Sequence, residues 1–285
     1  MPQTSHQTGR GLAATTLHKY ELALKRIEDA GLDLQNAKDV IAWVKSKSDT
    51  VGGQKVYYSA IKYHLAKPPF VFPDAYQNEI VRLYGIQNEG DKNQTLTEKQ
   101  VPNFVPYEEL LNVQKRLAAK ENKSDADWRD YLIASLYTLT PPVRADYGNV
   151  RILKRRAPKH TGNALVWGLK KGDYFIFKEY KTSGTYGTVE VRVPPALHTV
   201  IEEWFAHLGK IPSTLLGRVI TPNDLLGDID HAFRSTKKKI GINLLRHAYI
   251  KHHFPQLKTI REKEELALKM LHSKDKQEEY NSQNV

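Results

Sequence analysis

Five side chains in the second half of the chain are of the types that can cleave a phosphodiester bond without a metal ion. They are Arg144, Lys181, Arg246, His272 and Tyr280. A tyrosine can attack phosphorus, a guanidinium group can hold two phosphate oxygens through parallel hydrogen bonds, and a lysine can protonate the leaving oxygen. A tyrosyl phosphodiester conserves the energy of the broken bond, so the cut strand could be rejoined without ATP. The set predicts reversible cleavage of a strand, with Tyr280 as the nucleophile.

Each of these residues also has an ordinary structural explanation. Arg144 could bridge to Asp146, Lys181 could be a solvated loop residue, and His272 could cap the end of a helix. Arg246 is different because it lies among Leu244, Leu245, Ala248 and Ile250. A buried guanidinium group needs partners. The functional prediction therefore depends on the five residues together rather than on any one of them.

Charge and composition narrow the partners and exclude several kinds of site. The 285-residue chain carries a formal charge of +11, which favours a polyanion such as DNA. It has no cysteine, which excludes disulfides, thiol catalysis and cysteine–zinc sites. The first residues do not resemble a signal peptide, and no apolar run approaches the ~20 residues of a membrane helix. We expect no membrane association and an intracellular location wherever the target DNA lies.

The first part of the chain reads as a disordered tail over residues 1–14 and a helical domain over residues 15–86. Thr15 or Thr16 could start the first helix, with Gly31 at its end, and Thr50 could cap a third helix that runs to Leu65. We also expect a helix over 36–47 and a short one after Pro73. Lys55 and Lys62 on the third helix are candidates for DNA contact. Residues 87–102 lack apolar periodicity and are predicted to be a linker.

The second part, residues 103–285, switches from helices to strands and back to helices. Helices are expected over 107–117 and 128–139, and then three strands over 165–169, 174–180 and 188–193 that form an antiparallel meander. Four later helices are expected. One covers 196–208, one begins at a capping box formed by Thr221 and Asp224, and the last two cover 243–253 and 259–271. The basic run Lys237, Lys238 and Lys239 is a further candidate for DNA contact. The fold class is mainly α with a small antiparallel β-meander.

The order of these residues resembles the tyrosine recombinase, or phage-integrase-type, superfamily. The motif residues are Arg144 in TPPVRADY, Lys181 in YKTSGTYGTVEVRVP, Arg246 in NLLRHAYI, His272 in MLHS, and Tyr280 after it. The resemblance implies a site-specific recombinase or integrase that works through a 3′-phosphotyrosyl intermediate. It also implies a core-binding domain before the catalytic domain, a homo-tetramer on paired double-stranded DNA sites, and no cofactor or metal. The PP-V-R-x-D-Y run is similar to integrases of eukaryotic DNA viruses or mobile elements.

Two positions depart from the family pattern. Asn243 stands where H-x-x-R has its histidine, so it can bind phosphate but cannot accept a proton. The acidic residue that usually follows the first arginine by three positions is replaced by Tyr147, with Asp146 one position early. A type IB topoisomerase and a catalytically inactive DNA-binding protein of the same fold therefore remain alternatives. A zinc site from His247, His252, His253 and His272 is a further alternative, although their spacing is not that of a zinc motif.

Overall fold

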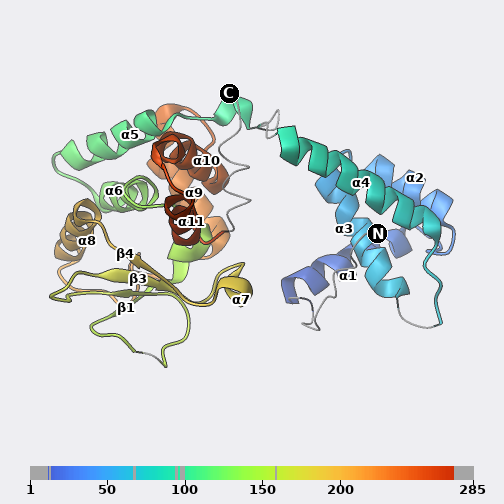
Figure 1. Ribbon diagram of the computed structural model, residues 1–285, viewed down its shortest axis with the longest axis horizontal. Helices are drawn as coiled ribbons and strands as arrows, with labels where there is room; N and C mark the ends of the chain where they lie inside the picture. The colour runs from blue at the N-terminus through green and yellow to red at the C-terminus, as the bar shows by residue number, and fades with distance from the viewer. Residues whose placement is uncertain are drawn as a thin grey trace. The chain divides into compact units, whose positions relative to one another are not determined.

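The computed structural model describes residues 12, 14–66, 69–93, 96, 100–157 and 159–272. Tyr280 lies outside the described residues. The chain divides into two compact units, residues 1–93 and 94–285 (Figure 1). The division falls inside the segment predicted to be a linker.

The N-terminal unit contains four helices, α1 (Ala14–Asp29), α2 (Ala37–Lys47), α3 (Val51–Leu65) and α4 (Asp74–Asn93). The predicted cap of α3 is confirmed, because the Thr50 side chain accepts a hydrogen bond from the Gly53 amide. Gly31 has a φ of 68°, as expected after a helix end. Two predictions were wrong: α1 begins before Thr15, and α4 continues to Asn93, well into the predicted linker.

The helices of the C-terminal unit enclose one large hydrophobic core. Its helix α6 is buried at ten of its 14 residues, and α10 at eight of its 12. Capping boxes start α6 at Ser124, α9 at Thr221 and α11 at Thr259, so the predicted start of α9 is confirmed. The helices are α5 (Tyr107–Ala119), α6 (Asp125–Thr138), α7 (Ser183–Tyr186), α8 (Pro195–His207), α9 (Pro222–Ala232), α10 (Ile242–His253) and α11 (Ile260–Lys269). Short 3₁₀ turns cover Val101–Asn103, Ala145–Asn149, Arg234–Thr236 and Phe254–Gln256.

The three predicted strands form the expected antiparallel meander, and a fourth strand that was not predicted extends it. The sheet has four strands in the order β1 (Arg151–Leu153), β2 (Ala164–Val166), β3 (Tyr174–Phe177) and β4 (Val189–Arg192). β1 pairs with β2 in parallel, and the other two pairs are antiparallel. The sheet is therefore mixed. The sequence did not indicate β1 because Arg151–Leu153 begins with an arginine and runs directly into basic residues.

One face of the sheet packs on the helical core. Phe175 and Phe177 of β3 and Val189 and Val191 of β4 belong to that core, and the helices lie on this side (Figure 1). Glu190 and Arg192 alternate with these valines and are exposed. The sheet thus presents its other face away from the helices, as the period-two alternation of β4 requires.

Candidate active site

Arg246 is held in the middle of α10 by main-chain carbonyl groups. The residue is fully buried, and its Nη1 donates hydrogen bonds of 2.9 Å to the carbonyls of both Pro142 and Met270. These acceptors come from the segment after α6 and from the end of α11. The buried guanidinium group therefore links three segments that are distant in sequence.

Arg144 contacts the same turn. Its Nη1 lies 3.4 Å from the carbonyl oxygen of Leu271, the residue after Met270. Its main chain is fixed by the Tyr137 hydroxyl, which donates to the Arg144 carbonyl at 2.8 Å, and by Asp146 Oδ2, which accepts from the Arg144 amide at 3.1 Å. Both arginines thus donate to consecutive carbonyls at the end of α11.

The turn that presents these carbonyls has an unusual backbone. Leu271 is buried and has a φ of 57°, which a residue with a side chain adopts rarely. The His272 amide donates to the Ala267 carbonyl at 3.1 Å, which is the bond that closes a Schellman-type helix end. Such strained positions tend to cluster at functional sites, where the surrounding structure holds them.

His272 follows this turn into a buried position beside both arginines. Burial, Arg246 and Arg144 together lower the pKa of His272 to about 2. The imidazole is therefore neutral at physiological pH, and it can hydrogen-bond to a phosphate or a phenol without carrying a charge. Burial raises the pKa of Asp146, although both arginines act to lower it.

The buried histidines predict a loss of stability in mild acid. Burial and Arg246 also lower the pKa of His247 to about 4. Because both folded pKa values lie below the unfolded value of about 6.5, the unfolded chain binds more protons and the free energy of unfolding falls as the pH drops below that value. At about pH 5 each histidine lowers it by about 2 kcal/mol.

Urea unfolding at about pH 7.5 and about pH 5 measures this change in the free energy of unfolding. His272→Gln, which is neutral at both pH values, should remove about a third of the change, because burial also lowers the pKa of His253 to about 4. Equal stability at the two pH values would mean that the histidines are accessible to protons in the folded protein.

The hairpin that carries Lys181 is also attached to the turn at Leu271. Lys181 itself is exposed, and the Oγ1 of its neighbour Thr182 donates to the Leu271 carbonyl at 3.1 Å. The helical turn α7 follows directly, where the sequence predicted a plain loop. One carbonyl oxygen therefore accepts from both Arg144 and the residue next to Lys181.

Asn163 is a positioning residue that the sequence did not indicate. It is buried, and its Oδ1 accepts from the amides of Lys178 and Glu179, each at 3.0 Å. Its Nδ2 donates to the carbonyl of Glu179 at 2.9 Å and to that of Asp146 at 3.4 Å. The side chain thus joins the stem of the Lys181 hairpin to the segment that follows Arg144.

The remaining candidate for the site, Asn243, lies in the first turn of α10. Its side chain is exposed, and it precedes Arg246 by three residues, close to one turn of the helix. The neighbour of Arg246, His247, is buried. The structure therefore brings Arg144, Arg246 and His272 to one turn of the chain and attaches the Lys181 hairpin to it.

The candidates for DNA contact differ in their surroundings. Lys55 is half-buried, with its Nζ 3.6 Å from the centre of the Tyr84 ring and 2.5 Å from Gln87 Oε1. Lys62 is exposed. Lys237, Lys238 and Lys239 are exposed as well, although the Nζ of Lys238 donates to the Pro102 carbonyl at 2.7 Å. Their contact with DNA stays a prediction.

The histidines of the alternative zinc site lie in different surroundings. His252 Nδ1 is 2.7 Å from Glu108 Oε1, and His252 and His253 both contact the Tyr107 ring. In the described part of the chain, no group of three or more histidine or acidic residues is arranged to hold a metal ion. No described helix is long and apolar enough to cross a membrane.

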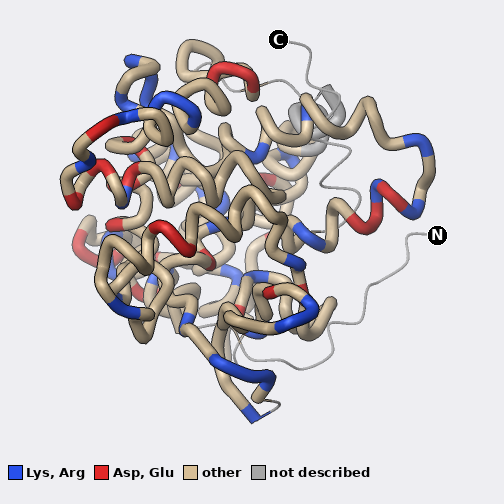
Figure 2. The backbone as a smooth tube through the Cα atoms, turned by 90° about the vertical axis from the view of Figure 1, so that its left-hand side faces the viewer, with Lys and Arg blue, Asp and Glu red and all other residues tan. Residues whose placement is uncertain are grey.

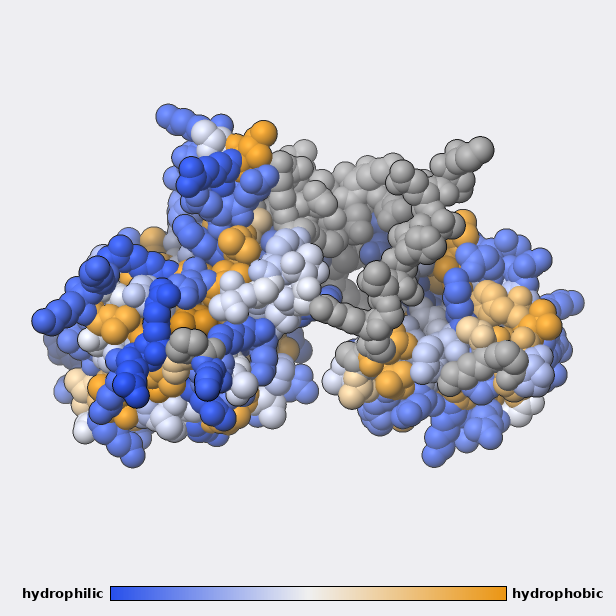
Figure 3. All heavy atoms as spheres, turned by 60° about the horizontal axis from the view of Figure 1, so that its bottom comes forward, coloured by the Kyte–Doolittle hydropathy of each residue, from blue (hydrophilic) through white to orange (hydrophobic). Residues whose placement is uncertain are grey.

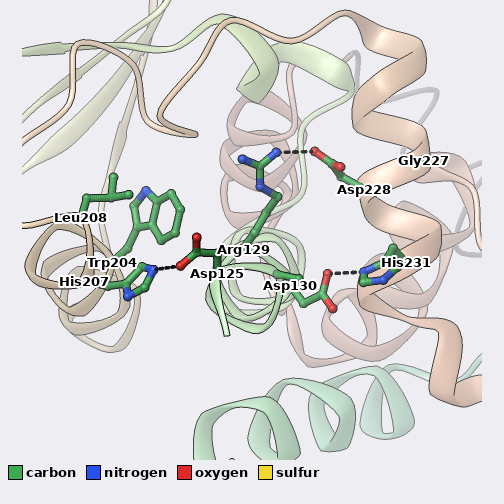
Figure 4. Close-up of a pocket in the computed structure, with 10 residues that line it drawn as sticks. Asp125, Arg129, Asp130, Trp204, His207, Leu208, Gly227, Asp228 and His231 are labelled. Carbon is green, nitrogen blue, oxygen red and sulfur yellow. Dashed lines mark hydrogen bonds and ion pairs between the residues drawn. The ribbon is translucent and has the colours of Figure 1, made fainter. Parts of the chain in front are cut away.

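A cavity of about 800 Å³ lies away from the candidate residues, between α6, α8 and α9 (Figure 4). Its charged side chains are paired across the walls. His207 lies 3.1 Å from Asp125, His231 lies 2.7 Å from Asp130, and Arg129 lies 3.7 Å from Asp228. These pairs join the three helices, and we interpret the cavity as part of the helical packing.

No family model matches the chain, and no curated protein matches it. Among solved structures, the crystal structure of XerA recombinase is similar, with a TM-score of 0.46 and 12% sequence identity over 96% of this chain and 88% of that chain. A similarity at this level does not assign the chain to a family.

Proposed function

We propose that the chain is a site-specific DNA recombinase that cuts and rejoins DNA through Tyr280. The observation that carries the proposal is the convergence of Arg144 and Arg246 on the consecutive carbonyls of Leu271 and Met270, beside His272. Two guanidinium groups from distant segments can hold the two non-bridging oxygens of one phosphodiester. Preorganised donors of this kind are each worth on the order of a hundredfold in rate.

In the proposed reaction the Tyr280 oxygen attacks the phosphorus, and the bond from phosphorus to the 5′-oxygen breaks. The phenolic proton passes to water, because Asn243 cannot accept it, and Lys181 protonates the leaving 5′-oxygen. Neutral His272 donates a hydrogen bond to the phosphate. Attack by the 5′-hydroxyl of a second duplex on the 3′-phosphotyrosyl bond then releases Tyr280 and completes strand exchange.

Arg246 and His272 are both buried in the described structure. Arg246 has 0% and His272 has 3% of its surface exposed, so a phosphate in solution cannot reach them directly. We infer that DNA binding opens the site before cleavage. Control of this kind suits an enzyme that acts as a homo-tetramer on paired DNA sites, because the site stays closed until DNA is bound.

Covalent trapping tests the proposed function. The full chain is incubated with nicked duplexes in the presence of EDTA, and adducts that resist SDS are measured. We expect an adduct with the wild-type protein and none with Tyr280→Phe, because phenylalanine has no nucleophilic oxygen. An adduct of equal yield in both proteins would show that Tyr280 is not the nucleophile.

Two other functions are separated by the same experiment. If DNA is bound and no adduct forms, the chain is a DNA-binding protein without catalysis, and Asn243 is the residue that favours this outcome. If the adduct forms and supercoiled plasmid is relaxed by monomeric protein without strand exchange, the enzyme acts as a topoisomerase. Analytical ultracentrifugation of the complex on paired sites distinguishes the tetramer from the monomer.

A further inference from the structure

The connection between β1 and β2 crosses the face of the sheet that points away from the helices. Parallel neighbours require the chain to return from one end of the sheet to the other. Arg156 in this loop pairs with Glu190 of β4 and lies 5.0 Å over the Tyr174 ring of β3. Near the other end, the Nζ of Lys178 donates to the His160 carbonyl at 2.6 Å. The loop is therefore held to the sheet at two points.

Burial on this face agrees with the path of the loop. Ala164 and Val166 of β2 and Ile176 of β3 are buried, yet they do not belong to the main hydrophobic core. Ala164 pairs with Ile176 across the two strands and Val166 pairs with Tyr174, whereas the alternating pair of Leu165 and Phe175 belongs to the core. The loop thus covers apolar side chains of the outer face and forms a fixed part of the surface.

The loop is strongly basic. Its sequence over 154–160 is KRRAPKH, without an acidic residue. Lys154, Arg155 and Lys159 are exposed, and none forms an ion pair with a carboxylate of the described residues. In Figure 2 the loop lies at the bottom of the view and carries blue segments up to its tip. Figure 3, which brings this side forward, shows strongly hydrophilic residues spread across the C-terminal unit at left.

The sheet topology places further basic residues beside the loop. Lys170 and Lys171 are exposed in the turn after β2, at the end of the sheet where β1 leads into Lys154. At the opposite end, the loop lies against Lys178, three residues before Lys181. Basic residues therefore lie at both ends of this face, and between them Glu190 is paired with Arg156.

We propose that this basic face, formed by Lys154, Arg155, Lys159, Lys170 and Lys171, contacts the phosphate backbone of duplex DNA beyond the cleaved position. The identity of the partner rests on the proposed function, because the hairpin beside the face carries the residue assigned to the leaving oxygen. Loop residues 154–160 include no large apolar side chain that would insert into a membrane. Each neutralised phosphate releases a condensed counterion, so the contact has a defined dependence on salt.

The test compares two triple variants with equal loss of charge. Lys154→Gln, Arg155→Gln and Lys159→Gln remove the loop cations and leave Arg156 to hold the loop on the sheet. The matched control is Lys115→Gln, Lys210→Gln and Arg218→Gln, which changes three exposed cations outside the sheet and its loops. The affinity of each full-length protein is measured from about 50 to about 200 mM salt.

Each protein is tested on a short duplex and on one extended by about one helical turn on each side. On the longer duplex we expect the loop variant to bind at least about tenfold more weakly, with the slope of log affinity against log salt reduced by about 2 to 3. We expect the control variant to change the slope by less than about 1, and the short duplex to show a smaller difference between the variants.

Equal losses in the two variants, or no loss in either, would overturn the inference. If loss of these three cations weakened binding to RNA or to phosphatidylserine vesicles more than binding to duplex DNA, the assignment of DNA as the partner would be overturned. Adduct formation on a nicked short duplex tests the proposed function separately. The loop variant could lose DNA binding selectively while the wild-type protein forms no adduct. That result would refute the proposed recombinase activity and still support DNA binding by the basic face.

Discussion

Arg246→Lys is expected to slow formation of the tyrosyl–DNA adduct by at least about a hundredfold. Lysine keeps the positive charge but lacks the planar fork that donates two parallel hydrogen bonds to a phosphate. Both bonds to Pro142 and Met270 come from Nη1, so a lysine ammonium that kept them would have no second nitrogen to offer to the phosphate. The measurement is the single-turnover rate of adduct formation at saturating DNA, with DNA affinity measured in parallel.

The matched control is Arg129→Lys in the same unit. Arg129 is half-buried and lies 3.7 Å from Asp228, away from the candidate site, so its replacement should leave the adduct rate within about twofold. Urea unfolding shows whether Arg246→Lys remains folded. A folded Arg246→Lys protein that forms the adduct at the wild-type rate would remove Arg246 from the proposed phosphate site.

Asn163→Asp is expected to cost about 2–4 kcal/mol of folding free energy and to slow adduct formation by at least about tenfold. The aspartate retains the acceptors for the amides of Lys178 and Glu179, but its second oxygen replaces the donor to the carbonyls of Glu179 and Asp146. A buried carboxylate would then face two carbonyl oxygens. We expect the hairpin of Lys181 to lose its fixed position relative to Arg144.

The pH dependence separates this positioning role from general destabilisation. Protonation of the introduced carboxyl restores one donor, so the ratio of wild-type to variant adduct rate should shrink as the pH is lowered. Asn149→Asp, at an exposed position in the same region, should leave stability and adduct rate nearly unchanged. A pH-independent ratio, or a variant with normal rate and lower stability, would limit Asn163 to a structural role.

The sequence predicted those parts of the fold that depend on side-chain patterns. Capping residues such as Thr50 and Thr221 mark helix starts through bonds that only their own side chains make. The apolar neighbours of Arg246 likewise indicated that its guanidinium group would be buried. β4 was predicted because Val189 and Val191 alternate with polar residues, and β2 and β3 overlap the apolar segments 165–169 and 174–180 that were assigned to strands.

The parts that the sequence did not indicate depend on the main chain or on distant contacts. β1 has three residues and owes its pairing to β2 and to the segment at Thr214. The carbonyls of Met270 and Leu271 carry no signature in the sequence, and the positive φ of Leu271 is unexpected for leucine. The contacts of Asn163 could not be predicted from the sequence, because they depend on the two distant segments that its side chain joins.

The use of main-chain acceptors has a consequence for how this site can diverge. Every residue offers a carbonyl, so substitutions at Pro142 or Met270 leave the acceptor itself in place. An insertion or deletion between Thr259 and His272 would instead rotate the carbonyls of Met270 and Leu271 away from both arginines, because each residue turns the helix by about 100°. The geometry around the two arginines is thus encoded in the length and path of α11 more than in its side chains.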